Sequence, residues 1–147
     1  MNQNIWKLKG RLIHRQKRRA QATAFYLGIT PEDFILDVGC GEGFVISHFL
    51  KAGYVVGVDT SISSLLIAKQ KLHGLNVEFV CADACSLPFR NGVFNKITML
   101  EVLEHLPKET QKKTCQEVDR ILKKEGIQFQ FLIKSKSYIR VAFAVVN

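Results

Sequence analysis

The 147-residue sequence lacks several features that mark specialised classes of protein. No apolar run reaches the roughly 18 residues needed to span a bilayer, and Lys7 and Lys9 stand where a secretory signal would be apolar. The four cysteines form no C-x-x-C pair and no zinc-ligand spacing, so we expect reduced, structural thiols. These absences predict a soluble, cytoplasmic protein without a transmembrane segment.

Acidic residues are absent before Glu32, whereas this stretch carries seven lysines and arginines and so supplies most of the net charge of +8. Such a run can steer an anionic partner such as RNA, a phospholipid surface or an acidic substrate. The interpretation that we favour is a solvated helix face, because aromatic residues that would stack on bases are missing there apart from Trp6.

Internal repeats, low-complexity tracts and linkers are also absent, so one domain is predicted over residues 31–147, preceded by a basic helical extension over residues 1–30. The helix of the extension is expected over residues 5–27, before the turn at Pro31. Strands are predicted at residues 34–38, 54–58, 77–81, 94–100 and 127–133, and helices at 44–51, 61–72 and 108–124.

This alternation of strands and helices is typical of an α/β protein with a Rossmann-like, doubly wound and mostly parallel sheet. Gly53 and Gly126 are predicted to end the helices that precede them. The tail, residues 134–147, is long enough for one edge strand or one helix only.

A glycine-rich turn follows the first strand in the sequence Asp37-Val38-Gly39-Cys40-Gly41-Glu42-Gly43. Ligands of open α/β sheets bind beyond the carboxyl ends of the strands, where glycines allow the backbone to approach a ligand closely. The G-x-G-x-G spacing differs from the G-x-G-x-x-G of dinucleotide sites, which disfavours NAD or FAD.

Two further acids follow the next two strands. Asp59 stands where a carboxylate can accept hydrogen bonds from both hydroxyls of a ribose, and Asp83 where one can accept from an adenine amino group. Each alone also fits a helix N-terminal acid or a turn residue. Three acids at the ends of three successive strands, beside a glycine turn, together indicate a binding site.

These segments resemble the class I S-adenosylmethionine-dependent methyltransferases, especially the small-molecule, type 11-like branch. The matching stretches are residues 35–43, 56–59, 81–84, 87–89 and 103–106, with 122–126 similar to the turn before the fifth strand. The resemblance implies a sheet order of 3-2-1-4-5 with the last strands missing or reduced, and S-adenosylmethionine as cofactor. The cofactor-binding residues that it implies are Asp37, Gly39, Cys40, Gly41, Gly43, Asp59, Thr60, Asp83, Ala84 and Glu101.

Transfer of the sulfonium methyl group to an oxygen, nitrogen or carbon atom mainly requires alignment of the reactants and exclusion of water. A general base is needed only when the accepting atom holds a weakly acidic proton, and the catalytic candidates are Glu101 and His105, with Glu104 beside them. A packing or capping role fits His105 equally well. Glu101, Glu104 and His105 also match an E-x-x-E-H magnesium or manganese motif, but the ligands are few and no metal is expected.

The family usually continues with a helix and two strands that help to build the acceptor pocket, and these are missing here. Two functions therefore remain open: a methyltransferase for a small molecule such as a lipid, quinone or metabolite, and a non-catalytic module completed by a second copy or a partner chain. An intermediate possibility is an RNA methyltransferase that binds RNA through Arg15, Lys17, Arg18 and Arg19. The lack of an Asn-Pro-Pro-Tyr-type signature at residues 100–103 disfavours nucleobase and glutamine acceptors.

Overall fold

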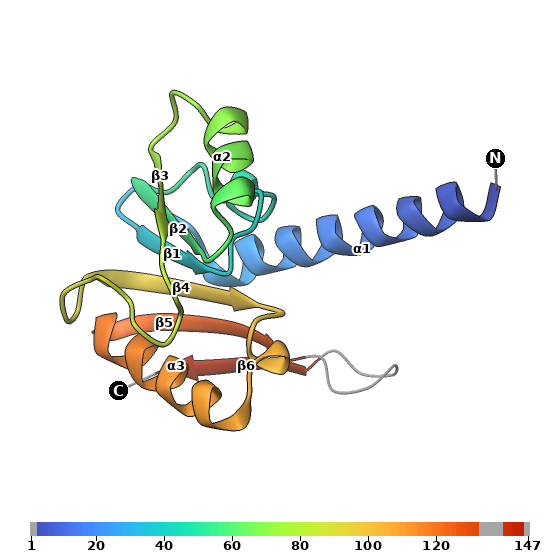
Figure 1. Cartoon of the computed structure of the whole chain (residues 1–147). Helices are drawn as coiled ribbons and strands as arrows, with labels where there is room; N and C mark the ends of the chain where they lie inside the picture. The colour runs from blue at the N-terminus through green and yellow to red at the C-terminus, as the bar shows by residue number, and fades with distance from the viewer. Residues whose placement is uncertain (1–2, 133–139, 146–147) are drawn as a thin grey trace.

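The computed structural model describes residues 3–132 and 140–145, and the side chains of residues 12–125. A six-stranded sheet in the order β3-β2-β1-β4-β5-β6 forms its centre (Figure 1). The strands are β1 (Phe34–Val38), β2 (Tyr54–Asp59), β3 (Val77–Cys81), β4 (Phe94–Leu100), β5 (Leu122–Leu132) and β6 (Arg140–Val145). Strands β1 to β5 pair in parallel and β6 pairs antiparallel to β5. The α/β fold and the 3-2-1-4-5 order are confirmed, and of the strand and the helix left open for the tail, the strand β6 forms.

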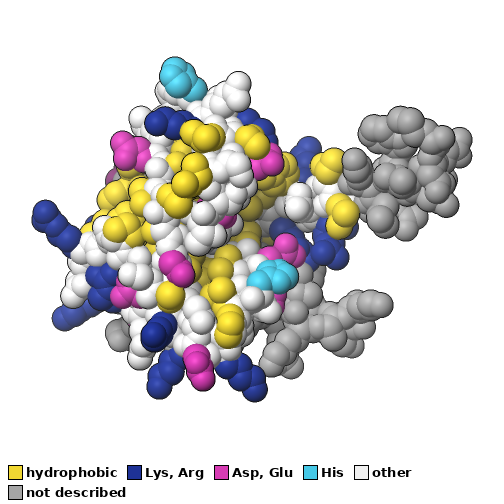
Figure 2. All heavy atoms as spheres, in the orientation of Figure 1, with side chains coloured by type: hydrophobic (Ala, Val, Ile, Leu, Met, Phe, Trp, Pro, Cys, Tyr) yellow, Lys and Arg dark blue, Asp and Glu magenta, His cyan; other side chains and the backbone are white. Residues whose placement is uncertain are grey.

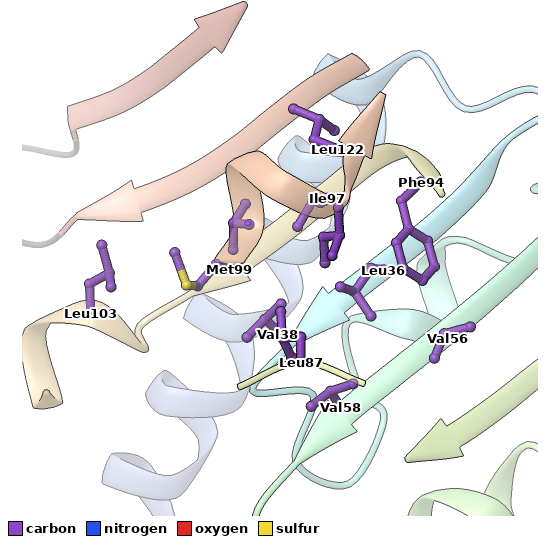
Figure 3. Close-up of a cluster of buried hydrophobic side chains, with 12 residues drawn as sticks. Leu36, Val38, Val56, Val58, Leu87, Phe94, Ile97, Met99, Leu103 and Leu122 are labelled. Atoms are coloured by element: carbon purple, nitrogen blue, oxygen red, sulfur yellow. The ribbon is translucent and has the colours of Figure 1, made fainter. Parts of the chain in front are cut away.

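Both faces of β1, β2 and β4 are buried, as expected for largely apolar strands inside a parallel sheet. Successive residues point to opposite faces, so Leu36 packs in one cluster and Ile35 in the other. The first cluster includes Val118 and Ile121 of helix α3 (Lys108–Ile121). Figure 3 shows other members of this cluster on neighbouring strands, such as Leu36 on β1, Val58 on β2 and Met99 on β4. The second is covered by helix α2 (Ile62–Lys71) and the end of helix α1 (Gln3–Leu27).

The helix predicted over residues 44–51 is wrong, because only the short 3₁₀ turn η1 (Ile46–His48) forms there. Ile46 and Phe49 are fully buried, and their spacing of three residues is satisfied by a single tight turn as well as by an α-helix. Gly53 therefore ends no helix. A Cβ atom at that position would lie 2.2 Å from the carbonyl oxygen of Pro31, so close approach of the backbone requires glycine.

The third helix ends earlier than expected. Helix α3 stops at Ile121 rather than Lys124, and β5 begins at Leu122 rather than at residue 127. Leu122 is extended, buried, and paired with Phe94 of β4. Burial of this leucine outweighs the helical preference of the charged residues after it.

A buried polar network fixes the end of α1 to the sheet. The Lys96 Nζ donates to the carbonyl oxygen of Gly28 at 2.9 Å and to the Asp33 Oδ2 at 2.5 Å. The Asn95 Nδ2 donates to the other oxygen of Asp33 at 2.7 Å. The rest of α1 projects beyond the sheet (Figure 1), and no helix in the described part of the chain is long and apolar enough to cross a membrane.

Candidate cofactor and acceptor site

Two neighbouring cavities open at the carboxyl ends of the parallel strands. The larger, of about 470 Å³, lies between the glycine turn and α1 and is called the turn–helix cavity. The smaller, of about 280 Å³, is lined by the loops after β2, β3 and β4 and is called the loop cavity. Gly39, Leu100 and Glu101 line both, so the end of β4 separates two adjacent compartments.

The glycine turn is held tightly against β2. The backbone N–H groups of Gly39 and Cys40 both donate to the carbonyl oxygen of Val58, at 2.7 and 3.0 Å. Gly39 has a φ of 74°, and a Cβ atom there would lie 2.3 Å from the Val102 Cγ2. Burial, reinforced by the charges of nearby carboxylates, raises the pKa of the Cys40 thiol. Cys40 is therefore a neutral packing residue and not a nucleophile.

Asp37 presents a buried carboxyl group with one unused oxygen. Its Oδ1 accepts a hydrogen bond from the Thr98 Oγ1 at 2.7 Å, whereas its Oδ2 has no partner among the described residues. Burial raises the pKa of Asp37 to about 7, the negative charge of Asp59 adds to this, and the Thr98 hydrogen bond opposes it. A cationic group in the turn–helix cavity would give this carboxylate a partner.

Asp59 links the glycine turn to α2. Its Oδ2 accepts from the Gly41 N–H and its Oδ1 from the Ser61 N–H, both at 2.9 Å. Each carboxylate oxygen keeps a second lone pair, so Asp59 can still accept from the two hydroxyls of a ribose. The Asp83 Oδ1 accepts from the Cys85 N–H at 3.0 Å, which lowers the pKa of Asp83 and keeps it charged. Both acids line the loop cavity, a placement that suits a nucleoside.

Arg19 enters the site from the basic helix α1. Its Nη1 donates to the Glu101 Oε1 in an ion pair, and its Nε is buried without a partner among the described residues. The Arg19 side chain is only 12% exposed, and burial beside the charge of Arg15 lowers its pKa. The interpretation of the whole basic segment as a solvated face is therefore wrong at Arg19. The 3–4 residue spacing of buried Ala20, Thr23 and Leu27 was the signal for a packed face here.

Glu101 has a left-handed backbone with a φ of 57°, and only the next residues, Leu103–His105, form the 3₁₀ turn η2. Glu101 of the E-x-x-E-H motif therefore lies outside the turn that holds Glu104 and His105. Glu101 and His105 line the loop cavity together, without Glu104. Among the side chains of residues 12–125, no group of three or more His, Cys, Asp or Glu is arranged to hold a metal ion.

Most of the residues expected at the site line one of the cavities. Those on the turn–helix cavity are Asp37, Gly39, Cys40, Gly41 and Glu101, and those on the loop cavity are Gly39, Asp59, Thr60, Asp83, Ala84, Glu101 and His105. Gly43 lines neither, because it packs against Ala68 and Leu72 of the α2 region. The lining residues that sequence reasoning missed are Gln16, Arg19, Val38, Glu42, Phe44, Val45, Val58, Lys71, Ala82, Leu100, Val102 and Leu106.

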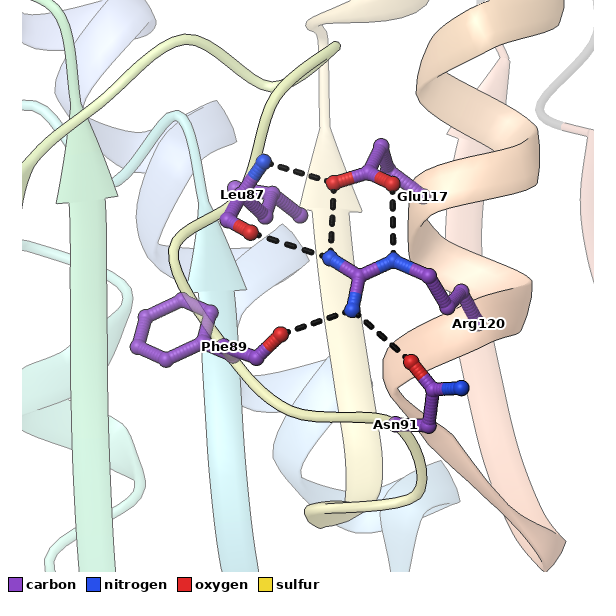
Figure 4. Close-up of polar contacts among 5 residues, drawn as sticks. All are labelled: Leu87, Phe89, Asn91, Glu117 and Arg120. Carbon is purple, nitrogen blue, oxygen red and sulfur yellow. Dashed lines mark hydrogen bonds and ion pairs between the residues drawn. The ribbon is translucent and has the colours of Figure 1, made fainter.

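The loop that follows Asp83 is fastened to α3 (Figure 4). Arg120 makes a two-pronged ion pair with Glu117, with both N–O distances 2.8 Å. The same guanidinium donates to the carbonyl oxygens of Leu87 and Phe89 at 3.0 and 2.7 Å, and Glu117 accepts from the Leu87 N–H at 2.7 Å. One arginine thereby fixes the path of the loop that carries the Asp83 side of the loop cavity.

Comparison with known proteins matches residues 35–126 to a methyltransferase domain. A cyclopropane-fatty-acyl-phospholipid synthase from Escherichia coli is 31% identical over 134 residues, which are 89% of this chain and 34% of that protein. A ubiquinone biosynthesis O-methyltransferase from Coxiella burnetii is 40% identical over 76 residues, which are 50% of this chain and 32% of that protein. The chain thus spans about a third of the length of these curated relatives.

The fold also matches solved structures. The YcgJ protein from Bacillus subtilis superposes with a TM-score of 0.71 and 26% sequence identity. The match covers 78% of this chain and 50% of that one.

Proposed function

Since this chain belongs to the methyltransferase domain family, we propose that it is an S-adenosylmethionine-dependent methyltransferase that acts on a small, largely apolar molecule. The observation that carries the proposal is the pair of adjoining cavities, one with acids suited to a nucleoside and one with a buried carboxyl group that lacks a partner. When bound, S-adenosylmethionine supplies a methyl group that is already activated on a sulfonium sulfur. The protein then has to bind and orient the cofactor and the acceptor and to exclude water.

Asp37 and Arg19 are proposed to hold the methionine end of the cofactor. Both line the turn–helix cavity, and each has one buried polar atom without a partner among the described residues. The Asp37 carboxyl group can pair with the amine of a bound amino acid moiety, and the Arg19 guanidinium can pair with its carboxylate. Asp59 is proposed to accept from the ribose, and the segment at Thr60, Asp83 and Ala84 to border the adenine.

The acceptor is proposed to enter the turn–helix cavity. Phe44, Val45 and Leu100 supply apolar lining there, and Gln16 supplies a neutral hydrogen-bonding group. The relatives named for ubiquinone biosynthesis and for cyclopropane-fatty-acyl-phospholipid synthesis support a lipid or quinone class of acceptor. Where the accepting atom holds a proton, Glu101 is the first proposed base, because it lines both cavities, and His105, which lines the loop cavity, is the second.

Calorimetric titration with S-adenosylmethionine and S-adenosylhomocysteine tests cofactor binding. We expect micromolar affinity, about −8 kcal/mol, in the wild type. Asp59→Ala should abolish it, and Asp119→Ala, which removes an exposed acid on α3, should leave it unchanged. Circular dichroism of each variant shows whether the protein is folded. A folded wild type without affinity for either compound contradicts the proposal.

Methyl transfer itself is tested with isotopically labelled S-adenosylmethionine and three acceptors: a hydroquinone, an unsaturated phospholipid and RNA. Label in the hydroquinone or the phospholipid supports the proposal. Label in RNA alone would favour the basic-helix alternative. Tight cofactor binding with no transfer to any acceptor would favour a module that needs a second copy or a partner chain.

A further inference from the structure

The part of α1 that projects from the domain combines exposed aliphatic side chains with lysines and arginines. Leu12 is 48% exposed and Ile13 58% exposed, and residues 14–18 are exposed as well. Figure 2 shows hydrophobic and basic side chains next to one another on the described part of this helix. Folding of the described residues leaves this surface uncovered.

The aliphatic residues continue the face by which α1 packs on the domain. Residues 13, 16, 20, 23 and 27 recur at intervals of three and four, which places them along one side of the helix. Ala20, Thr23 and Leu27 are buried against the domain, and Gln16 lines the turn–helix cavity. The same side then runs past the edge of the domain, where Ile13 and its neighbour Leu12 are exposed.

Cations surround this aliphatic surface. Arg15, Lys17 and Arg18 are all exposed, and no acidic residue occurs anywhere before Glu32 to neutralise them. An apolar side flanked by lysines and arginines is the pattern of a helix that lies in the interface of a membrane with anionic lipids.

We propose that α1 docks the protein onto an anionic phospholipid surface, with Leu12 and Ile13 inserted among the lipids and Arg15, Lys17 and Arg18 against the phosphates. A second copy is the poorer occupant, because two such helices would bring like charges together. RNA is also poorer, because phosphates would satisfy the cations but leave Leu12 and Ile13 in water. Since Gln16 and Arg19 of the same helix line the turn–helix cavity, docking would bring that cavity close to the lipid.

Co-sedimentation of the full chain with vesicles tests the proposal. We expect binding to phosphatidylglycerol-containing vesicles, little binding to pure phosphatidylcholine vesicles, and weakening by salt. Replacing Arg15, Lys17 and Arg18 together by Gln should weaken vesicle binding on the order of a hundredfold. Each of the three cations is expected to contribute a similar share of the electrostatic attraction to the anionic surface. The matched control replaces Lys108, Lys112 and Lys113, which are exposed on α3, by Gln and should bind as the wild type does.

A second variant, Leu12→Ser with Ile13→Ser, keeps every charge and tests insertion. It should bind anionic vesicles more than tenfold more weakly, since burial of two aliphatic side chains is lost. Unchanged vesicle binding by this variant, or equal losses in the α1 and α3 charge variants, would overturn the proposal. So would self-association of the wild type that the serine variant abolishes in the absence of lipid, or RNA binding that outcompetes the vesicles. Titration with S-adenosylmethionine checks that each variant retains its folded site.

Discussion

Arg19 and Glu101 lie 82 positions apart in the sequence and form an ion pair where the two cavities meet. The pair joins α1 to the residue that follows β4, and Glu101 makes it from a left-handed backbone conformation. A non-glycine residue in this region is strained, and such strain occurs often at functional sites. Helix α1, which the composition alone marks only as a basic extension, therefore forms one wall of the site.

Arg19→Gln is expected to weaken binding of S-adenosylmethionine about tenfold, equivalent to about 1.4 kcal/mol. The substitution removes the charge that pairs with Glu101 and that is proposed to face the cofactor carboxylate. Calorimetry gives the affinity, and the neighbouring Arg18→Gln is the control, because Arg18 is exposed. Equal affinity in the two variants would show that Arg19 has no part in binding.

Asp37 is expected to make stability depend on pH. Because burial raises its folded-state pKa from 3.8 to about 7, the folded protein favours the protonated form. The stabilisation is fully present below the ordinary pKa and is lost as the pH rises through about 7. Asp37→Asn should remove this component, so the wild type should lose up to a few kcal/mol more than the variant between about pH 4 and pH 8. Urea unfolding at several pH values measures the difference, and parallel profiles would contradict it.

The same carboxyl group should couple cofactor binding to proton release. A cationic amino group beside the Asp37 Oδ2 favours the ionised acid, so binding near neutral pH should expel a proton and affinity should increase from about pH 6 to pH 8. Calorimetry in buffers of different ionisation enthalpy counts the proton. Asp37→Asn is the isosteric control, and an unchanged proton count in that variant would assign the proton to another group.

Much of the sheet could be predicted because its buried parallel strands appear in the sequence as short, largely apolar runs. The strands at residues 34–38, 77–81 and 94–100 have their predicted bounds. Helical spacing was less specific, since Ile46 and Phe49 suit one 3₁₀ turn as well as a helix. The early start of β5 at Leu122 depends on pairing with Phe94, a contact that periodicity does not contain.

The acids of the site were similarly accessible to sequence reasoning. Asp37, Asp59 and Asp83 lie at or just beyond the carboxyl ends of three successive strands, and parallel strands bring these ends to one edge of the sheet. Arg19 was not accessible, because its role depends on a tertiary contact with Glu101 across most of the chain. Arg120 likewise acts on a loop that is about 30 residues earlier in the sequence.

Arg120→Lys is expected to loosen the loop between β3 and β4. A lysine retains the charge but cannot reproduce the two-pronged pair with Glu117 while also donating to the carbonyl oxygens of Leu87 and Phe89. We expect a loss of about 2 kcal/mol in unfolding free energy. Hydrogen exchange at the Leu87 amide, which donates to Glu117, should accelerate. Arg90→Lys in the same loop is exposed and should change neither measurement.

Substitution of Gly39 and of Gly41 by alanine separates the cost of a steric clash from the cost of backbone strain in the unfolding free energy. Both have positive φ values, 74° and 52°, so alanine at either position should cost about 1–2 kcal/mol in backbone strain. A Cβ atom at Gly39 would in addition lie 2.3 Å from the Val102 Cγ2, whereas none of the non-neighbouring atoms described lies within 4 Å of one at Gly41. Urea unfolding should therefore show a clearly larger loss for Gly39→Ala.

Val102→Ala provides the internal check on this interpretation. It removes the methyl groups that a Cβ atom at Gly39 would strike, so the double variant with Gly39→Ala should recover the steric part of the loss and keep the strain. Binding of S-adenosylmethionine should recover in parallel, because the turn could again lie against β2 at the Val58 carbonyl oxygen. If Gly39→Ala and Gly41→Ala are equally unstable, or if Val102→Ala gives no recovery, the glycine at position 39 is required for its conformation alone.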